Sequence, residues 1–356
     1  MAYTTIKKPS DYFNTVLYTG DGTSPRSITG VGFQPDFLWI KDRSTAYEHR
    51  LMDAVRGSNK VLHSSATTAE SSEEYYTVSS FDSDGWTGRS GTGTNQVITG
   101  GNDNGDNFVA WNWLASNTTA SNTDGDETST ISVNTTSGFS IVSWTSSDTT
   151  GATIGHGLGV APKVVIFKNR SGIHDWVVYH SSIGATKALY LSGSSGSVTS
   201  TGFFQDTAPT NTTFRVGSNN NTRGALNDNM IAYCFAEVKG FSKFGSYIGN
   251  GSADGTFIYT GFKPAFAIFK NIDAAEAWNL FDNKRIGHNG SSTSGNFHLN
   301  PNSTAVENVN TGDYIDFLSN GIKIRTATNS MNVAQNYIYM AFAEEPLVGD
   351  NPATAR

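Results

Sequence analysis

Short apolar runs recur along the whole chain, and a cluster of Gly, Asn, Asp or Ser follows each of them. In residues 229–236 large side chains alternate with small ones, as in Ile231, Ala232, Tyr233 and Cys234. A period of two residues is typical of a β-strand, and apolar residues at both phases indicate a strand that is covered on both faces. The hydrophobic pattern therefore predicts many short strands separated by polar turns.

Two of these patterns occur three times each. The first is a Gly-rich turn, a Pro, a four-residue apolar run and a Lys, and it occupies residues 32–41, 159–168 and 261–270. The second is an Asn followed by an alternating apolar run, in residues 107–113, 229–235 and 336–342. Both patterns keep their order and similar spacing, which predicts an internal threefold repeat. We expect the first to be a buried central strand with its Pro at the strand entrance, where no backbone donor is needed.

Weaker matches follow the same repeat. His49, Trp176 and Trp278 occupy corresponding positions after the first pattern, and residues 81–86 correspond to residues 317–322. The latter two segments contain an Asp-Gly and an Asn-Gly pair, which predict hairpins with a type I′ turn.

Composition supports an all-β chain. Ser, Thr and Asn make up nearly a third of the 356 residues, and charged residues only 15%. Helical proteins contain more Leu, Glu, Lys and Ala, so we predict little helix, and only residues 42–56 are ambiguous. The predicted fold is three tandem β-sandwich domains of jelly-roll-like form. They occupy residues 9–116, 138–238 and 239–348, with a polar linker at 117–137 and a C-terminal tail at 349–356.

Charge and composition exclude several classes of protein. Aromatic residues reach 12% and the net charge is −7, which argues against disorder. No apolar stretch is long enough for a membrane-spanning helix, and no apolar segment follows Lys7 and Lys8 as in a secretory signal. Lys and Arg are scattered, so we expect no nucleic-acid partner. Cys234 is the only cysteine, which rules out an intrachain disulfide and a cysteine-based zinc site.

Three tryptophans are candidate ligand contacts. Trp176 and Trp278 match in the repeat and each follows a polar loop, while Trp86 follows a hairpin turn. Such residues serve either as platforms on which a sugar stacks or as aromatic core residues that recur because the fold recurs. The pattern favours the core interpretation for the matched pair and leaves Trp86 as the more exposed candidate.

The loop at residues 100–107 is rich in Asp and Asn, which suits calcium. Its spacing differs from that of an EF-hand loop, and the corresponding loops near residues 219–221 and 329–332 carry no carboxylate. We therefore predict a turn and no metal site. We also predict no cofactor.

The sequence predicts no catalytic residues and no enzyme. The histidines show no HExxH spacing, and the chain has no Gly-x-Ser-x-Gly elbow and no phosphate-binding glycine loop. Cys234 lies in the middle of an apolar strand, where we expect a small core residue.

Residues 32–44, 53–57, 231–237 and 244–255 resemble a repeat domain that is common in virion proteins of tailed bacteriophages, especially phages of marine bacteria and cyanobacteria. The resemblance covers about residues 9–345. Such proteins are usually described as tail-fibre-like or minor structural proteins. The resemblance implies a structural protein of the virion, assembled in the host cytoplasm, and it brings no catalytic residues.

We therefore expect a virion surface protein, either a tail-fibre-like adhesin that contacts host surface glycan or a capsid decoration or head-fibre protein. A glycan depolymerase is less favoured. The expected partners are other virion proteins, with host glycan as a further candidate, in a homo-oligomer or a symmetric virion assembly without membrane insertion. The chain lacks the heptads of a fibre stalk, which suits a short accessory on the tail or capsid. Three like units would also let one chain imitate a trimer.

Overall fold

The computed structural model describes residues 4–71, 75–91, 98–285, 296–310 and 315–354. The protein is all-β, with 41% strand and 2% helix, and every ladder between its named strands is antiparallel. The ambiguous segment 42–56 contains strand β4 and no helix. Among the described helices, none is long and apolar enough to cross a membrane.

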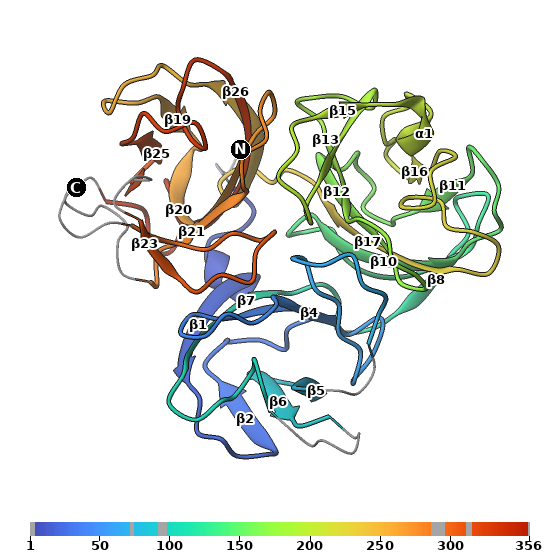
Figure 1. Ribbon diagram of the computed structural model, residues 1–356, viewed down its shortest axis with the longest axis horizontal. Coiled ribbons are helices and arrows are strands. Elements are labelled where there is room, and N and C mark those ends of the chain that lie inside the picture. Colours follow the sequence, from blue (N-terminus) through green and yellow to red (C-terminus); the bar gives the residue numbers. More distant parts are fainter. Residues whose placement is uncertain (1–3, 72–74, 92–97, 286–295, 311–314, 355–356) are drawn as a thin grey trace.

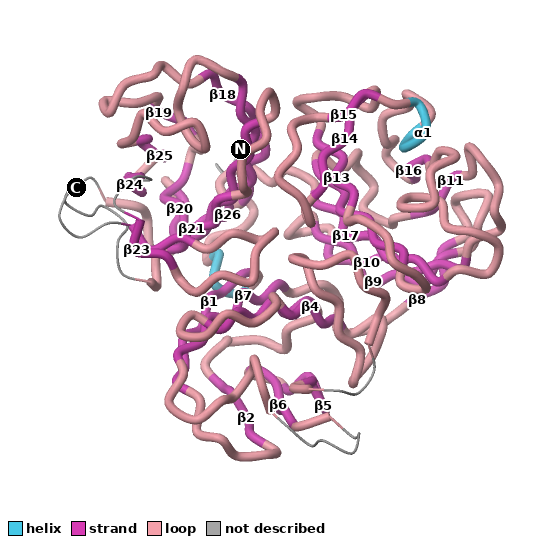
Figure 2. The backbone as a smooth tube through the Cα atoms, in the orientation of Figure 1, coloured by secondary structure: helices cyan, strands magenta, loops and turns pink. Residues whose placement is uncertain are grey.

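Three lobes surround a common centre (Figure 1; Figure 2 shows the strands of each). Lobe 1 comprises residues 9–116, lobe 2 residues 117–238 and lobe 3 residues 239–348. We call the contact between two lobes a seam, and the seams are 1/2, 2/3 and 3/1.

Lobe 1 follows a short 3-10 helix, η1 (Pro9–Asp11), and has two sheets. The larger has the order β1 (Phe13–Thr19), β7 (Asn107–Trp113), β3 (Phe37–Asp42) and β4 (Arg50–Asp53). The smaller has the order β2 (Arg26–Thr29), β6 (Gly85–Arg89) and β5 (Thr77–Asp82).

The main sheet of lobe 2 has more strands than that of lobe 1, and lobe 2 also contains one turn of helix, α1 (Thr201–Phe204). The main sheet has the order β15 (Val198–Thr199), β14 (Lys187–Tyr190), β13 (Val177–His180), β12 (Val164–Asn169), β17 (Asn229–Phe235), β10 (Phe139–Thr145), β9 (Ser129–Asn134) and β8 (Ala120–Asn122). The second sheet pairs β11 (Thr153–Gly155) with β16 (Thr213–Arg215).

Lobe 3 has two sheets like those of lobe 1 and a further two-stranded sheet. Its main sheet has the order β18 (Ser242–Ile248), β26 (Asn336–Pro346), β20 (Phe262–Asn271) and β21 (Asn279–Asp282). The second sheet has the order β19 (Phe257–Tyr259), β25 (Gly321–Ile324) and β24 (Ile315–Leu318), and β22 (Asn296–His298) pairs with β23 (Asn308–Asn310).

The two repeated sequence patterns form adjacent central strands in every lobe. The Pro-containing pattern gives β3, β12 and β20, and the Asn pattern gives β7, β17 and β26, as predicted. The expectation that the Pro marks the strand entrance is wrong for β20, because Pro264 lies inside that strand at a break in its register with β26. On β17 the large residues Ile231, Tyr233 and Phe235 belong to a core shared by all three lobes, whereas Ala232 and Cys234 belong to the core of lobe 2 alone. Both faces of the strand are therefore buried, and the small residues lie on the face toward the lobe's own second sheet.

Three aromatic rings meet at the centre of the molecule. Trp113, Phe235 and Phe342 are the last aromatic residues of the three matched strands, one from each lobe. Their ring centroids are 6.4 Å apart for Trp113 and Phe235, 5.9 Å for Phe235 and Phe342, and 5.7 Å for Phe342 and Trp113. This triangle of contacts ties every lobe to the other two.

The predicted linker at 117–137 is wrong for most of its length. It contains β8 and β9, and β9 pairs with β10 and extends the main sheet of lobe 2. Ile131 is buried and Val133 packs beside it against the lobe 2 core. Alternation between these two apolar residues and small polar ones suffices for a strand at the end of an existing sheet, although the segment is polar overall.

The hairpin prediction at residues 81–86 is confirmed, but the predicted turn type is wrong. Asp82 pairs with Gly85, so the loop consists of Ser83 and Asp84, and neither residue has the positive φ that a type I′ turn requires. Gly85 instead begins β6, where an added Cβ would lie 2.0 Å from the carbonyl oxygen of Ile28. The glycine is required because the neighbouring strand approaches too closely for a side chain.

Candidate functional site

The tryptophan predicted to be most exposed is buried. Trp86 has no exposed surface, and its indole Nε1 donates to the Tyr76 hydroxyl at 2.8 Å. Trp176 and Trp278 are 0% and 5% exposed. The core interpretation that the pattern favoured for Trp176 and Trp278 is therefore confirmed, and the expectation that Trp86 is more exposed is wrong. The structure does not bring them together, because each lies in a different lobe.

The matched tryptophans bind neighbouring lobes through their ring nitrogens. At each seam a ring N–H at the same repeat position donates to a main-chain carbonyl of the adjacent lobe: Trp176 to His63 at 2.8 Å, Trp278 to Tyr190 at 2.8 Å, and His49 Nε2 to Asn300 at 3.1 Å. The Nδ1 of His49 accepts from the Trp39 indole, which places the imidazole proton on Nε2. A histidine therefore performs in lobe 1 the role that tryptophan performs in lobes 2 and 3.

A buried lysine crosses each seam next to these rings. The ammonium of each lysine that ends the Pro pattern donates to a carbonyl of the neighbouring lobe: Lys41 to Thr304 at 3.2 Å, Lys168 to Thr67 at 2.9 Å, and Lys270 to Ser194 at 2.9 Å. Burial lowers the pKa of each of these lysines to about 8, so each remains charged at neutral pH. Each ammonium also donates to main-chain carbonyl oxygens of its own lobe.

Seam 1/2 adds a buried ionic network. The carboxylate of Glu70 accepts from Arg170 of lobe 2 at 2.8 Å and from Arg56 of its own lobe at 3.1 Å. Burial opposes ionisation of Glu70, but the hydrogen bonds from Arg170 and Arg56 outweigh it and hold the pKa of Glu70 below its usual value. Asp53 pairs with Arg56 and accepts from the hydroxyl of Tyr233 at 2.7 Å.

Seam 3/1 repeats this network, and seam 2/3 replaces it. Glu307 accepts from Arg43 at 2.7 Å and from Arg285 at 3.0 Å. At seam 2/3 the positions of Glu70 and Arg170 hold Ser197 and Ile272, yet the same main-chain hydrogen bond joins them, with Ser197 N donating to Ile272 O at 2.8 Å. The backbone geometry of the seams is therefore common, and the side chains that cover it differ.

Two groups with nucleophilic or acid–base potential, Cys234 and His180, are buried in the core. Cys234 is a free, buried thiol, as predicted, and burial raises its pKa. His180 is buried, its Nδ1 accepts from Ser182 N–H, and its Nε2 lies 3.2 Å from the carbonyl of Tyr339 at seam 2/3. Burial lowers the pKa of His180 to about 4, so the ring is neutral at physiological pH.

The centre between lobes 2 and 3 holds a small cavity. Its volume is about 20 Å³, and apolar side chains such as Ile166, Ile268 and Trp278 line most of it. That is room for one water molecule and excludes an organic substrate.

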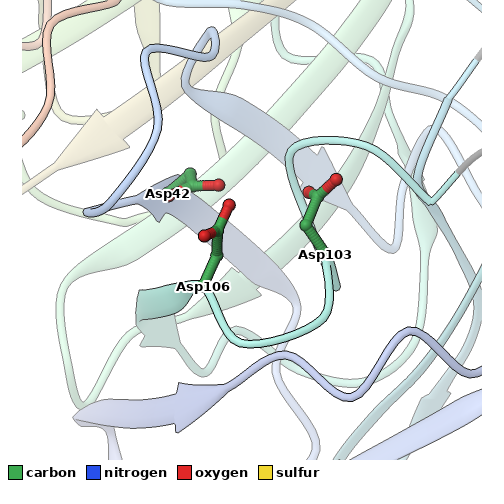
Figure 3. Close-up of side chains that lie close together, drawn as sticks. All are labelled: Asp42, Asp103 and Asp106. Carbon is green, nitrogen blue, oxygen red and sulfur yellow. The ribbon is translucent and has the colours of Figure 1, made fainter.

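Three carboxylates gather at the outer end of β3 in lobe 1 (Figure 3). Asp42 ends the strand, while Asp103 and Asp106 lie in the loop that leads into β7, within the segment 100–107 whose composition suits calcium. One oxygen from each lies within 4.8 Å of the others. Burial raises the pKa of Asp42 to about 6, and Asp106 adds to the effect.

Neither the seam network nor the carboxylate cluster was predicted from the sequence. The lysine that ends each Pro pattern could have indicated the seams, because a charged residue that recurs at the end of a buried strand needs hydrogen-bond partners. Arg56, Glu70 and Glu307 carried no such signal, since their partners lie in other lobes.

A family model described as a domain of unknown function (DUF7483) matches residues 8–346. A search of curated proteins finds no match.

Proposed function

Because this chain belongs to the DUF7483 family, whose model spans all three lobes, we propose a single role for the three lobes together. The protein is a structural component of the surface of a tailed-phage virion. One chain supplies three copies of one β-sandwich domain around an approximate threefold axis, and it imitates a trimer. It carries no catalytic activity.

One observation carries the threefold part of this proposal. At every seam a ring N–H and a lysine ammonium, each from the same repeat position, donate to carbonyls of the adjacent lobe. Three unrelated domains would have no reason to meet through the same atoms three times. The common strand order of the main sheets and the central triangle of aromatic rings agree with it.

The arrangement favours a decoration protein over a glycan-binding adhesin. The three lobes share one central strand order, so one chain can place three related domains at a threefold position of a symmetric shell. The adhesin interpretation loses its proposed contacts, since Trp86, Trp176 and Trp278 are all buried. The proposal that the protein belongs to a virion rests on the resemblance of the repeat motifs to phage structural proteins.

The oligomeric state tests the imitation of a trimer. Light scattering coupled to size exclusion should give the mass of one 38.2 kDa chain over a wide concentration range. A stable trimer of chains would contradict the proposal, because it would place nine lobes where three suffice, and it would favour a fibre. Antibody labelling of intact phage particles tests the virion location, and label confined to particle-free fractions would refute it.

A further inference from the structure

The carboxylates of Asp42, Asp103 and Asp106 form a cluster of like charges that neither neighbouring lobe reproduces. We propose that these three residues bind one divalent cation of the Ca²⁺ type at the outer end of β3. The proposal concerns a binding site that is separate from the role of the whole chain, and it does not depend on that role.

The geometry of the cluster suits one ion. Ca²⁺ binds carboxylate oxygens at roughly 2.3–2.6 Å, so two ligands of one ion lie no more than about 5 Å apart. The three oxygens lie within 4.8 Å of one another (Figure 3). Asp42 is buried, whereas Asp103 and Asp106 are partly exposed, which leaves a route for the ion and for water ligands.

The loop that carries two of the ligands is fixed in place. Arg50 is buried and donates to the carbonyls of Thr99 at 2.7 Å and Gly100 at 3.0 Å. Asp103 accepts from Gly100 N–H at 2.5 Å, and Asp106 accepts from the Thr45 hydroxyl at 2.9 Å. The loop is therefore positioned before any ion arrives.

Lobes 2 and 3 have a different residue at the position of Asp42. The residue that ends the Pro-pattern strand is Asp42 in lobe 1 but Asn169 in lobe 2 and Asn271 in lobe 3. In all three, Oδ1 accepts from the backbone N–H two residues later, on Ser44, Ser171 and Asp273. The lobes differ only in the other atom of the side chain.

That other atom is a donor in two lobes and an acceptor in the third. Asn169 Nδ2 donates to the carboxylate of Asp228 at 2.8 Å, and Asn271 Nδ2 donates to Gln335 Oε1 at 2.7 Å. In lobe 1 the corresponding pair is Asp42 and Asp106. Two carboxylates therefore face each other in lobe 1, at the place where lobes 2 and 3 have an amide that donates to a side-chain oxygen.

The second oxygen of Asp42 consequently lacks a partner. Asp42 is 0% exposed, and no described residue donates to its Oδ2. The ammonium of the adjacent Lys41 donates instead to the carbonyl oxygen of Asp42 at 2.6 Å and to lobe 3. A buried carboxylate oxygen without a donor is costly, and a metal ion removes that cost while it also neutralises Asp106.

The donor set determines the class of ion. Three carboxylates, with no imidazole or thiolate among the described ligands, suit a hard cation such as Ca²⁺ and disfavour zinc and copper.

Calorimetry on the full chain, stripped with chelator and titrated with CaCl₂, tests the site. We expect one binding event, with a dissociation constant of about 10⁻⁴–10⁻³ M, as in extracellular calcium-binding modules. Calcium should also raise the melting temperature. Asp42→Asn copies lobes 2 and 3, so it should fold normally and weaken calcium binding at least about tenfold.

Two further variants complete the test. Asp103→Asn should weaken binding without touching the buried residue, which covers the case that Asp42→Asn fails to fold. Asp124→Asn removes an exposed carboxylate in lobe 2 and should bind calcium like the wild type. An unaltered calcium response in Asp42→Asn, or no response in the wild type at millimolar calcium, would overturn the proposal.

Discussion

Replacement of Glu70 by Ala should destabilise the protein through seam 1/2. The substitution removes the carboxylate that accepts from Arg56 at 3.1 Å and from Arg170 at 2.8 Å. The side chain of Arg56 is 0% exposed and that of Arg170 is 14% exposed, so neither guanidinium regains full hydration. The backbone hydrogen bond from Glu70 N to Arg170 O remains, because alanine also provides that donor.

The structure gives the size of the effect. Loss of one partner from a buried ion pair costs about 3–5 kcal/mol. Arg56 keeps Asp53 as a second partner, which reduces the loss. Hydrogen bonds to charged groups contribute about 1.5–3 kcal/mol each, and the bond to Arg170 is partly hydrated, so we expect a loss near 3 kcal/mol.

Urea unfolding followed by tryptophan fluorescence measures the free energy of unfolding. Lys243→Ala is the control, because the Lys243–Glu237 pair has side chains 37% and 29% exposed and its loss should cost less than about 1 kcal/mol. A loss below about 1 kcal/mol in Glu70→Ala would refute the assignment of the network as a structural element of the seam.

Seam 2/3 provides a rescue that only a repeated architecture allows. A multiple variant can copy the residues of seam 2/3 into seam 1/2. It combines Asp53→His, Arg56→Ile, Glu70→Ser, Arg170→Ile and Tyr233→Met. The residues copied are, in the same order, His180, Ile183, Ser197, Ile272 and Met340. Replacement of a buried ion network by packed apolar residues is often neutral, so this variant should recover to within about 1.5 kcal/mol of the wild type. Failure of the multiple variant to exceed Glu70→Ala would contradict the equivalence of the two seams.

Three further changes test the core, the titrating groups and a close backbone approach. Trp113→Ala removes the ring that contacts both other lobes and should cost about 3–5 kcal/mol, and calorimetry should show the single unfolding transition shift as a whole. The unfolded chain protonates His180 near its ordinary pKa of about 6.5, but the folded chain does so only near 4, so stability should fall as pH decreases across this window. His180→Gln should remove up to about 3 kcal/mol of that loss, as measured by urea midpoints at pH 7 and pH 4. Gly321→Ala places a Cβ 2.2 Å from the Ile258 carbonyl and should cost at least about 2 kcal/mol, whereas Gly193→Ala, 3.6 Å from its nearest neighbour, should be neutral in the same assay.

The strands at the heart of each lobe were predictable because local sequence specifies them. The alternation of Ile231, Ala232, Tyr233 and Cys234 determines a strand with two buried faces, and burial at both phases is what the structure shows. The Pro that precedes β3 and β12 marks the strand entrance for the same reason, since Pro donates no backbone hydrogen bond.

The destination of the large face was not predictable from one lobe. Tyr233 faces the shared centre because lobe 1 lies there, and the ring centroids of Phe37 and Tyr233 are 4.2 Å apart. The local sequence pattern around Tyr233 carries no information about a neighbouring lobe. The role of Trp176 at a seam was not predictable for the same reason, because its carbonyl partner belongs to His63 of lobe 1. The linker prediction failed because β9 becomes a strand only when β10 is present to pair with it.

The carboxylate site shows a different limit. The composition of residues 100–107 suits calcium, but the sequence predicted a turn without a metal. The third carboxylate of the cluster, Asp42, lies far away in sequence at the end of β3. Its significance emerges only from comparison with Asn169, which holds the equivalent position and donates where Asp42 does not.

A virion map reconstructed without imposed symmetry tests the central claim most directly. We expect one chain centred on each occupied threefold position, with lobes 1, 2 and 3 each facing an equivalent surface of the shell. Several chains grouped around such an axis, or a chain bound through one lobe away from any threefold position, would contradict the account.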